Sequence, residues 1–281
     1  MQFAHMPLPF VKMSGTGNDF ILIDHRKQVI AREVMPEFAR LVCRRRFSVG
    51  ADGLIFIEDS DRADFKWLFF NADGSEAEMC GNGARCAARF AYMKGIAPAH
   101  LRFETIAGII EANVADVNVS VLMTPPKGFR QDLELDCDGR PVLLHTVDTG
   151  VPHAVVFVDD YDQVDVCRLG SGIRHHPQFK PAGTNVNFVM PLGNGAFKVR
   201  TYERGVENET LACGTGAVAS ALIAAIKGQA ESPVEIVTSG GDRLTIIFDL
   251  RKGPAATNVF LKGPAHVIYS GELNGEALLD K

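Results

Sequence analysis

The sequence alternates short apolar runs with two long alanine-rich segments. The runs are rich in β-branched and aromatic residues, which is typical of buried strands. They lie at Phe20–Ile23, Leu54–Ile57, Phe65–Phe70, Val155–Val158, Asn187–Met190, Phe197–Tyr202, Val234–Val237 and Leu244–Phe248. The alanine-rich segments, Gly83–Lys94 and Gly216–Lys227, are of helical length, and a glycine follows each, as expected just past a helix C-terminus. The pattern predicts a strand-rich protein with one strong helix in each half.

Apolar residues occupy nearly every side of the second predicted helix, from Val218 to Ile226. A helix that is apolar all round lies inside its domain rather than on the surface. We therefore expect the strands of each half to curl around such a central helix.

The two halves repeat each other at a constant offset of 133 residues. Thr16–Gly17 recurs as Thr149–Gly150, and the densest match joins Cys80–Ala84 to Cys213–Ala217. Chance recurrence of common residues would not hold one register over such a distance, so the halves are copies. The fold class predicted is α+β, with two pseudo-symmetric domains from an internal duplication. Each is expected to be a curled, mainly antiparallel sheet around its central helix.

The length of 281 residues suits two ordinary domains. We expect an N-terminal domain at 1–124, which carries Cys80, and a C-terminal domain at 125–264, which carries Cys213. The linker would lie near Thr124–Gly128, and the segment from about 265 would return to the first domain.

Charge and composition narrow the class of function. The formal net charge is −5, and the basic residues are scattered, apart from Arg44–Arg46 in an apparent helix. We therefore expect no nucleic-acid or membrane-surface partner. The N-terminal segment lacks a basic region followed by an apolar stretch, and no apolar run reaches the length of a membrane span, so a cytoplasmic location is expected.

Six cysteines occur, and none are spaced Cys-x-x-Cys as in zinc or dithiol redox sites. We expect no metal site. Cys43, Cys86, Cys137 and Cys167 are interpreted as small buried hydrophobic residues.

Cys80 and Cys213 have different surroundings, because each directly precedes Gly-x-Gly-Ala at the start of a predicted helix. The free backbone N–H groups and positive partial charge of a helix start stabilise a thiolate and attract a carboxylate. Glycines at 81, 83, 214 and 216 would let a ligand approach those amides. Taken singly, such a cysteine is more often structural, but a repeated pair favours catalysis.

Two such cysteines on opposite faces of a carbon centre could invert it. One thiolate would remove a proton, and the other thiol would return a proton to the opposite face. Helix-start amides would stabilise the intermediate carbanion, so no cofactor is expected. No Gly-x-Gly-x-x-Gly after a strand and no Walker loop is evident.

Together with several further short motifs, the two cysteine motifs resemble those of the diaminopimelate epimerase family. They cover nearly the whole chain, at Gly15–Phe20, Phe70–Glu76, Met79–Arg85, Pro152–His153, Gly183–Phe188, Tyr202–Gly205 and Ala212–Gly216. The resemblance implies an enzyme that interconverts LL- and meso-diaminopimelate, in lysine and peptidoglycan precursor synthesis, as a homodimer and without a cofactor.

The resemblance also implies roles for individual residues. Cys80 and Cys213 would be the catalytic pair, and Gly81, Asn82, Gly214 and Thr215 would hold the reacting carboxylate. Asn18, Asn71, Asn185, Glu203 and Arg204 would line the pocket, with Arg204 available for the second carboxylate. On the repeat alone, the three asparagines could equally be turn residues, and Glu203–Arg204 a solvated strand end. The motif match favours the pocket.

His153 and Glu203 would tune the thiols, since such groups can accept or relay a proton. A lone histidine after a proline is otherwise more often a turn residue. Three departures from the family pattern concern pocket detail: Val151 replaces an asparagine, Gly53 replaces a glutamine, and the loop 205–209 is one residue longer than usual.

Two alternatives stay open. One is another isomerase of the same structural class, such as a proline or hydroxyproline racemase or a phenazine-pathway isomerase. Such a proline-type site would have no use for Arg204 and the three asparagines. The other is a thiol redox or metal-binding protein, which would cycle a disulfide or retain a metal.

Overall fold

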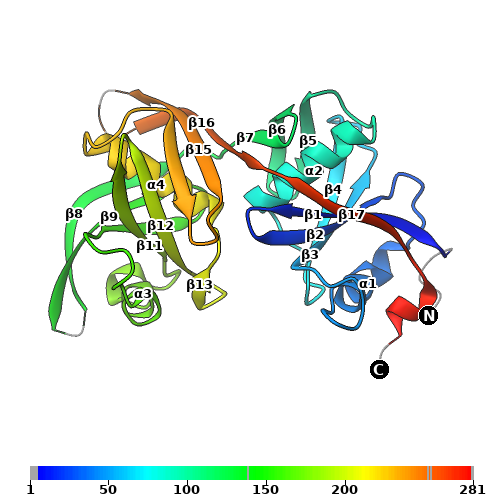
Figure 1. The fold of residues 1–281 in the computed structure, drawn as a ribbon, viewed down its shortest axis with the longest axis horizontal. Coiled ribbons are helices and arrows are strands. Elements are labelled where there is room, and N and C mark those ends of the chain that lie inside the picture. Colours follow the sequence, from blue (N-terminus) through cyan, green and yellow to red (C-terminus); the bar gives the residue numbers. More distant parts are fainter. Residues whose placement is uncertain (1–5, 138, 252, 254, 280–281) are drawn as a thin grey trace. The chain divides into compact units, whose positions relative to one another are not determined.

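The computed structural model describes residues 6–137, 139–251, 253 and 255–279, and these form two compact units. The first unit combines the chain up to Val121 with the segment from Gly263, and the second spans Leu122–Lys262. Figure 1 labels their elements. The predicted domain boundaries, 1–124 and 125–264, remain a proposal.

The first unit is built mostly from strands, with two α-helices. Its elements are β1 (Leu8–Gly15), β2 (Asn18–Asp24), α1 (Met35–Val42), β3 (Gly53–Glu58), β4 (Phe65–Asn71), α2 (Gly81–Met93), β5 (His100–Thr105), β6 (Gly108–Ala115), β7 (Asn118–Leu122) and, from the far end of the chain, β17 (His266–Leu273). Short 3₁₀ turns lie at Arg32–Val34 and Gly275–Leu278.

The second unit repeats this plan. Its elements are β8 (Lys127–Cys137), β9 (Arg140–Asp148), β10 (Pro152–Phe157), α3 (Val166–Arg174), β11 (Asn185–Gly193), β12 (Ala196–Glu203), β13 (Asn208–Thr210), α4 (Gly214–Ile226), β14 (Val234–Thr238), β15 (Arg243–Arg251) and β16 (Ala255–Pro264). A 3₁₀ turn lies at Pro177–Phe179.

Strand pairing follows the same order in both units. In the first, β2 runs parallel to β3, β3 antiparallel to β4, β4 parallel to β5, and β5 antiparallel to β6. In the second, β10, β11, β12, β14 and β15 repeat these directions in turn. Antiparallel pairs outnumber parallel ones between the described strands. The prediction of a duplicated, mainly antiparallel α+β fold is confirmed.

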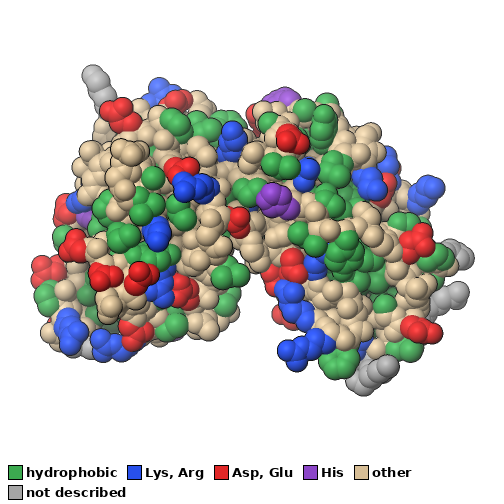
Figure 2. Space-filling view, viewed as in Figure 1, with side chains coloured by type: hydrophobic (Ala, Val, Ile, Leu, Met, Phe, Trp, Pro, Cys, Tyr) green, Lys and Arg blue, Asp and Glu red, His purple; other side chains and the backbone are tan. Residues whose placement is uncertain are grey.

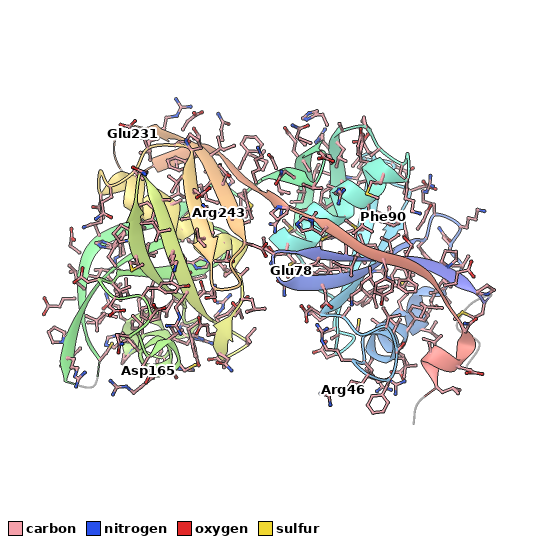
Figure 3. All side chains as sticks on the ribbon, viewed as in Figure 1. Arg46, Glu78, Phe90, Asp165, Glu231 and Arg243 are labelled. Carbon is pink, nitrogen blue, oxygen red and sulfur yellow. The ribbon has the colours of Figure 1, made fainter. Side chains whose placement is uncertain are left out.

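Each unit buries its long helix. Ten consecutive residues of α4, Gly216–Ala225, are buried, as its uniformly apolar sequence predicts. In α2 the buried side includes Phe90, which is labelled in Figure 3. Both helices begin two residues earlier than predicted, directly after the cysteine, and this makes each cysteine the N-cap residue.

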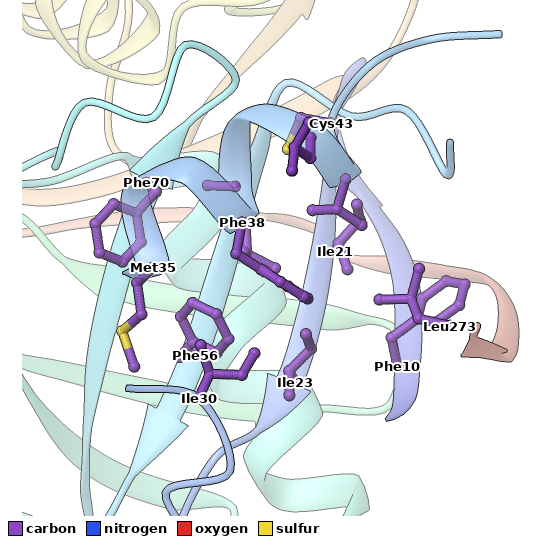
Figure 4. Close-up of a cluster of buried hydrophobic side chains, with 14 of the residues drawn as sticks. Phe10, Ile21, Ile23, Ile30, Met35, Phe38, Cys43, Phe56, Phe70 and Leu273 are labelled. Carbon is purple, nitrogen blue, oxygen red and sulfur yellow. The ribbon is translucent and has the colours of Figure 1, made fainter. Parts of the chain in front are cut away.

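Helix α1 closes one side of the first unit over a cluster of aromatic and aliphatic side chains. Phe38 and Met35 of α1 meet Phe56 of β3 and Phe70 of β4 in this cluster, which Figure 4 shows. The ring centroids of Phe38 and Phe56 lie 6.1 Å apart. Such burial of large apolar side chains fixes where β3 and β4 end, and therefore where Asn71 lies.

The predicted helical placement of Arg44–Arg46 is wrong. Helix α1 ends at Val42, and Arg46 has a positive φ of 74°, which a helix does not allow. Arg45 instead turns toward the carboxylates of Asp19 and Asp52.

The prediction for the four structural cysteines is confirmed for three of them. Cys43, Cys86 and Cys137 are buried, but Cys167 is exposed. Helix α3 turns Val166, Gly170 and Ile173 inward. Cys167 therefore falls on the outer side of the same turn, where its Sγ lies 3.1 Å from Asn208 Oδ1.

The visible surface of each unit carries acidic and basic side chains interspersed with one another (Figure 2). Among the described residues, none of the helices combines the length and apolar character that a membrane crossing needs.

Candidate active site

Cys80 caps the start of α2 in an extended conformation, with φ −148° and ψ 119°. Its Sγ accepts a hydrogen bond from the backbone N–H of Gly83 at 3.4 Å, and its carbonyl accepts from Ala84. The sulfur is half-buried. It therefore lies among the first amides of a buried helix, where a thiolate is stabilised.

Asn82, in the first turn of α2, belongs to a buried polar network. Its Nδ2 donates to Asn18 Oδ1 at 2.6 Å, and its Oδ1 accepts from Thr16 Oγ1 and from Arg85 Nη2, both at 3.0 Å. Arg85 has no solvent exposure and also donates to Thr16 Oγ1 and to the carbonyls of Gly81 and Pro264. The structure thus joins two predicted site residues, Asn18 and Asn82, through direct contact.

An ionic cluster holds Asn18 from the other side. Asn18 Nδ2 donates to Asp52 Oδ2 at 3.1 Å, while Arg45 binds both Asp52 and Asp19. Buried Lys12 lies 2.9 Å from Asp19 and donates to the carbonyl of Gly50. Burial alone would raise the pKa of Asp19, but hydrogen bonds from Arg45 and Lys12 outweigh it and lower that pKa to about 2. The amide of Asn18 is therefore fixed by charged neighbours.

Asn71, at the end of β4, lies in a turn of its own. Its Nδ2 donates to Ser75 Oγ at 3.0 Å, and its backbone N–H donates to the Ser75 carbonyl. None of its hydrogen bonds between described residues joins it to Asn18 or Asn82. The nearby departure at Gly53 has a packing reason, because a Cβ there would lie 2.6 Å from the ring of Phe69.

Cys213 caps the start of α4 in the same extended conformation, with φ −122° and ψ 108°. Its Sγ lies 3.5 Å from Thr215 Oγ1, and its carbonyl accepts from Ala217. Thr149, the repeat equivalent of Thr16, donates to the Thr215 carbonyl at 3.2 Å. Both copies therefore use a buried threonine to hold the residue two places after the cysteine.

His153 is buried behind the start of α4. Its Nδ1 lies 3.0 Å from Asn187 Nδ2, and its Nε2 has no hydrogen-bond partner among the described residues. Burial, together with the nearby Arg204 charge, lowers the pKa of His153 to about 3. The imidazole is therefore neutral at physiological pH.

Glu203 and Arg204 close the end of β12. Arg204 donates its backbone N–H to Asn185 Oδ1 at 2.7 Å and its Nη1 to the Ala182 carbonyl. The Glu203 carboxylate accepts from Thr210 Oγ1 at 2.9 Å. Burial raises the pKa of Glu203, and the Thr210 hydrogen bond offsets part of that rise. The structure thus joins Asn185 to the Arg204 backbone.

A small cavity opens beside Cys213 within the second unit. Its walls are formed by β12, β14, the first turn of α4 and the residues that lead into that helix. Cys213 shares it with Val199, Thr201, Thr210, Leu211, Ala212, Ala217, Ile236 and Thr238. Since Thr210 also binds Glu203, the cavity connects the thiol to a carboxyl group through one threonine.

The predicted role of Gly83 and Gly216 in ligand approach is wrong. A Cβ at Gly83 would lie 3.3 Å from Ile55 and 3.5 Å from Phe20 and Trp67. One at Gly216 would lie 2.2 Å from Asn187 Oδ1. Protein atoms fill that space, so these glycines allow the helix to pack on the sheet. Only Gly81 and Gly214 stay candidates for ligand contact.

Sequence reasoning gave no role to Arg85, Asn187, Thr16, Thr149 or Thr201, which hold the predicted site residues in place. The recurrence of Thr16 as Thr149 was a usable signal, and Asn187 stands in the same motif as Asn185. In the described part of the chain, no group of three His, Cys, Asp or Glu side chains is arranged to hold a metal ion.

Solved structures share the fold over nearly the whole chain. A phenazine biosynthesis protein of the PhzF family from Bacillus anthracis aligns with a TM-score of 0.72 at 16% identity, over 95% of this chain and 99% of that one. A probable proline racemase from Agrobacterium radiobacter gives 0.68 at 15% identity, over 95% and 93%. At these identities the likeness concerns the fold alone. Fold and site together define a protein of the duplicated α+β type, with one cysteine at the start of each central helix.

Sequence relatives identify the family. The family model described as diaminopimelate epimerase matches residues 10–128 and 145–268. A diaminopimelate epimerase of Aquifex aeolicus is 48% identical over 96% of this chain and 99% of the relative. The protein of that name from Hydrogenobaculum is 48% identical over 94% and 98%. The chain belongs to the diaminopimelate epimerase family.

Proposed function

We propose that this protein interconverts LL-2,6-diaminopimelate and meso-diaminopimelate without a cofactor, with Cys80 and Cys213 as the two bases. One observation carries the proposal: in a chain of this family, each cysteine is the N-cap residue of the central helix in one of two copies of the same fold. A two-base inversion needs two equivalent groups of this kind, because the reaction runs in both directions.

The proton balance is simple. A thiolate takes the α-proton from one face of the substrate carbon, and the electron pair stays on the substrate as a carbanion conjugated with its carboxylate. The second cysteine, a thiol, gives its proton to the opposite face. The first cysteine ends as a thiol and the second as a thiolate, so the enzyme is ready for the reverse direction.

The helix starts support this chemistry. The amides of Gly81–Asn82 and Gly214–Thr215 lie at the positive ends of α2 and α4. They are suited to hold the carboxylate next to the reacting carbon and to stabilise the charge that grows on it. No electron-accepting cofactor is then needed for the step.

The second amino-acid end of the substrate requires a separate set of polar groups. Arg204 offers a guanidinium for the distal carboxylate, and Glu203 offers an acceptor for the ammonium group. Asn18, Asn71 and Asn185 would add amide hydrogen bonds. Asn18 and Asn185 suit this role because Asp52, Asn82 and the Arg204 backbone already fix their amides.

His153 and Glu203 would adjust the proton affinity of the thiols. The raised pKa of Glu203 makes its carboxyl a better proton acceptor than an exposed glutamate. His153 is neutral, so it adds no positive charge near the reacting groups.

The test is proton exchange in deuterated water. Wild-type protein incubated with LL-diaminopimelate should form the meso product with deuterium at the inverted α-carbon. NMR follows both the product and the incorporated deuterium. Cys80→Ala and Cys213→Ala should each lower the rate by roughly 10²- to 10⁴-fold or more. Cys167→Ala is the matched control, because Cys167 is exposed on α3 and should keep the wild-type rate.

Other outcomes would redirect the proposal. Inversion of proline, with diaminopimelate inert, would replace the substrate assignment by a proline-type racemase. Absence of exchange with any amino acid, together with a reversible disulfide or bound metal, would favour a thiol redox or metal protein.

We further propose that the protein acts in the cytoplasm as a homodimer, in lysine and peptidoglycan precursor synthesis. Light scattering of the purified protein tests the dimer, since a monomer at micromolar concentration would contradict it. Loss of growth on deletion of its gene, restored by meso-diaminopimelate and lysine, would support the pathway.

A further inference from the structure

The side chain of His153 is buried with one ring nitrogen bonded and the other without a partner. It is 1% exposed, and the contact of Nδ1 with Asn187 Nδ2 measures 3.0 Å. Nε2 is also buried and has no hydrogen-bond partner among the described residues. An unsatisfied polar atom in such a place costs stability, so its retention points to a role.

The orientation of Asn187 decides which ring nitrogen carries the proton. The terminal amide atom of Asn187 placed as Nδ2 lies 2.9 Å from the carbonyl oxygen of Ala154. A carbonyl can only accept, so the atom that faces it must be the NH₂ group. The second N–H of the same group then points to His153 Nδ1, which must be the acceptor. The proton of the neutral ring is therefore on Nε2.

Two further contacts keep Asn187 in this orientation. Thr201 Oγ1 donates to Asn187 Oδ1 at 3.0 Å, and Asn187 has no solvent exposure. The same Oδ1 packs against Gly216, where an added Cβ would lie 2.2 Å away. Thr201 also lines the cavity beside Cys213, so the chain of contacts runs from His153 to the wall that holds the thiol.

We propose that Asn187, held by Thr201, is a positioning residue that fixes His153 in the Nε2–H tautomer, so that His153 can only donate a hydrogen bond at the site. The catalytic role of this tautomer rests on the proposed function, whereas the tautomer itself does not. Of the two groups expected to tune the thiols, Glu203 is then the proton acceptor and His153 the hydrogen-bond donor.

The charges around the ring agree with this division. Arg204 acts on His153 electrostatically and disfavours the imidazolium, in the same direction as burial. The carboxylate of Glu203, next to Arg204 in the sequence, is bonded to Thr210, and the polar side chain bonded to the His153 ring is the uncharged Asn187. An uncharged partner at Nδ1 keeps the ring neutral, whereas a carboxylate there would favour imidazolium.

The direct test is NMR of the full-length protein labelled with ¹⁵N-histidine. Two-bond ¹H–¹⁵N correlations distinguish the two tautomers and the imidazolium, and His153→Gln identifies the signals. We expect the Nε2–H pattern for His153 from about pH 8 to about pH 5. A ring protonated on Nδ1, an even mixture of tautomers, or an imidazolium at neutral pH would overturn the proposal.

Substitutions then test the role of Asn187 and Thr201. Asn187→Asp places a carboxylate against Nδ1, so the proton should move to Nδ1 or the ring should become imidazolium. Thr201→Val removes the donor to Oδ1 and should give mixed tautomers, while Thr201→Ser keeps the donor and should restore the wild-type pattern. Wild-type signals in both Asn187→Asp and Thr201→Val would contradict the positioning role.

Kinetics separate positioning from folding. In Asn187→Asp, kcat should fall by roughly 10²-fold, and its pH profile should gain an ionisation between about pH 5 and pH 8. KM should change much less. Asn113→Asp, an exposed position on β6, is the matched control for added charge and should leave kcat and its pH profile unchanged. An unchanged pH profile of kcat in Asn187→Asp would contradict a catalytic role for the positioning of His153 by Asn187.

The two proposals can fail separately. If the protein does not epimerise diaminopimelate while His153 shows the Nε2–H pattern, the proposed function fails and the positioning by Asn187 stands. If epimerisation occurs but the proton lies on Nδ1, the function stands and this inference fails.

Discussion

The first turns of α2 and α4 begin alike but are held by different groups. In both, a cysteine is the N-cap, a glycine in the third position packs against the sheet, and a threonine contacts the residue two places after the cysteine. Around α2, however, a buried guanidinium from Arg85 and two asparagines fill the space. The repeat equivalent of Arg85 in α4 is Val218, and the neutral His153 lies behind that helix instead.

This difference shows what a duplicated site must keep and what it can change. The helix start and its cysteine are common to both copies, and the proposed two-base inversion would need them twice. The residues that support each helix start differ between the two copies. The first copy holds a buried guanidinium and asparagine amides, and the second holds a buried histidine and a buried carboxyl group.

The largest effect should come from removing the buried cation of the first copy. Arg85→Met removes the guanidinium hydrogen bonds to the Thr16 hydroxyl, to Asn82 Oδ1 and to the Gly81 carbonyl. We expect the free energy of unfolding to fall by about 3 kcal/mol or more, measured by urea denaturation. Arg89→Met, one turn later on α2 and half-exposed, should cost about 1 kcal/mol. Equal losses in the two variants would mean that the network around Asn82 adds nothing.

The next effect compares the third positions of the two helices. Gly216→Ala forces Cβ onto Asn187 Oδ1 and should lower the free energy of unfolding by about 1–3 kcal/mol through overpacking. Gly83→Ala meets only side-chain carbons at 3.3 Å or more, and a helix-propensity gain of about 1 kcal/mol should offset most of its cost. Denaturation curves check both values. A milder loss in Gly216→Ala than in Gly83→Ala would contradict the packing at Asn187.

The smallest effect is the pH dependence that His153 gives to the second copy. Its pKa is about 3 in the folded protein and 6.5 when unconstrained. Below pH 6.5 the unfolded chain binds a proton at this histidine that the folded chain does not bind. The free energy of unfolding therefore falls as the pH falls. Between about pH 6 and pH 5 this group should remove about 1 kcal/mol from the free energy of unfolding. His153→Gln should lack that part of the slope. Parallel curves for both proteins would show that the folded ring titrates normally.

Much of the fold could be predicted from the sequence because the internal duplication repeats the same motifs in both halves. The offset between Cys80 and Cys213 located both long helices to within two residues of their observed starts. Cys167 was placed wrongly because an apolar neighbour, Val166, does not reveal which side of a short helix faces the sheet.

The supporting residues could not be predicted, and the reason is physical. Arg85 in an alanine-rich helix has the local pattern of a solvated arginine, and only its distant acceptors, Thr16 and the Pro264 carbonyl, make it buried. Asn187 likewise acquires its role from Thr201 and Ala154, which lie on other strands. Contacts between strands far apart in sequence leave no periodic trace.

The return of the chain to its beginning has a consequence for the order of folding. Strand β1 lies between β2 and β17, and β17 is formed by His266–Leu273 at the far end of the chain. The second unit is continuous in sequence and can complete its strand pairing as soon as residue 262 is available. The first unit must wait for β17, so during synthesis on the ribosome the half that is made first is finished last.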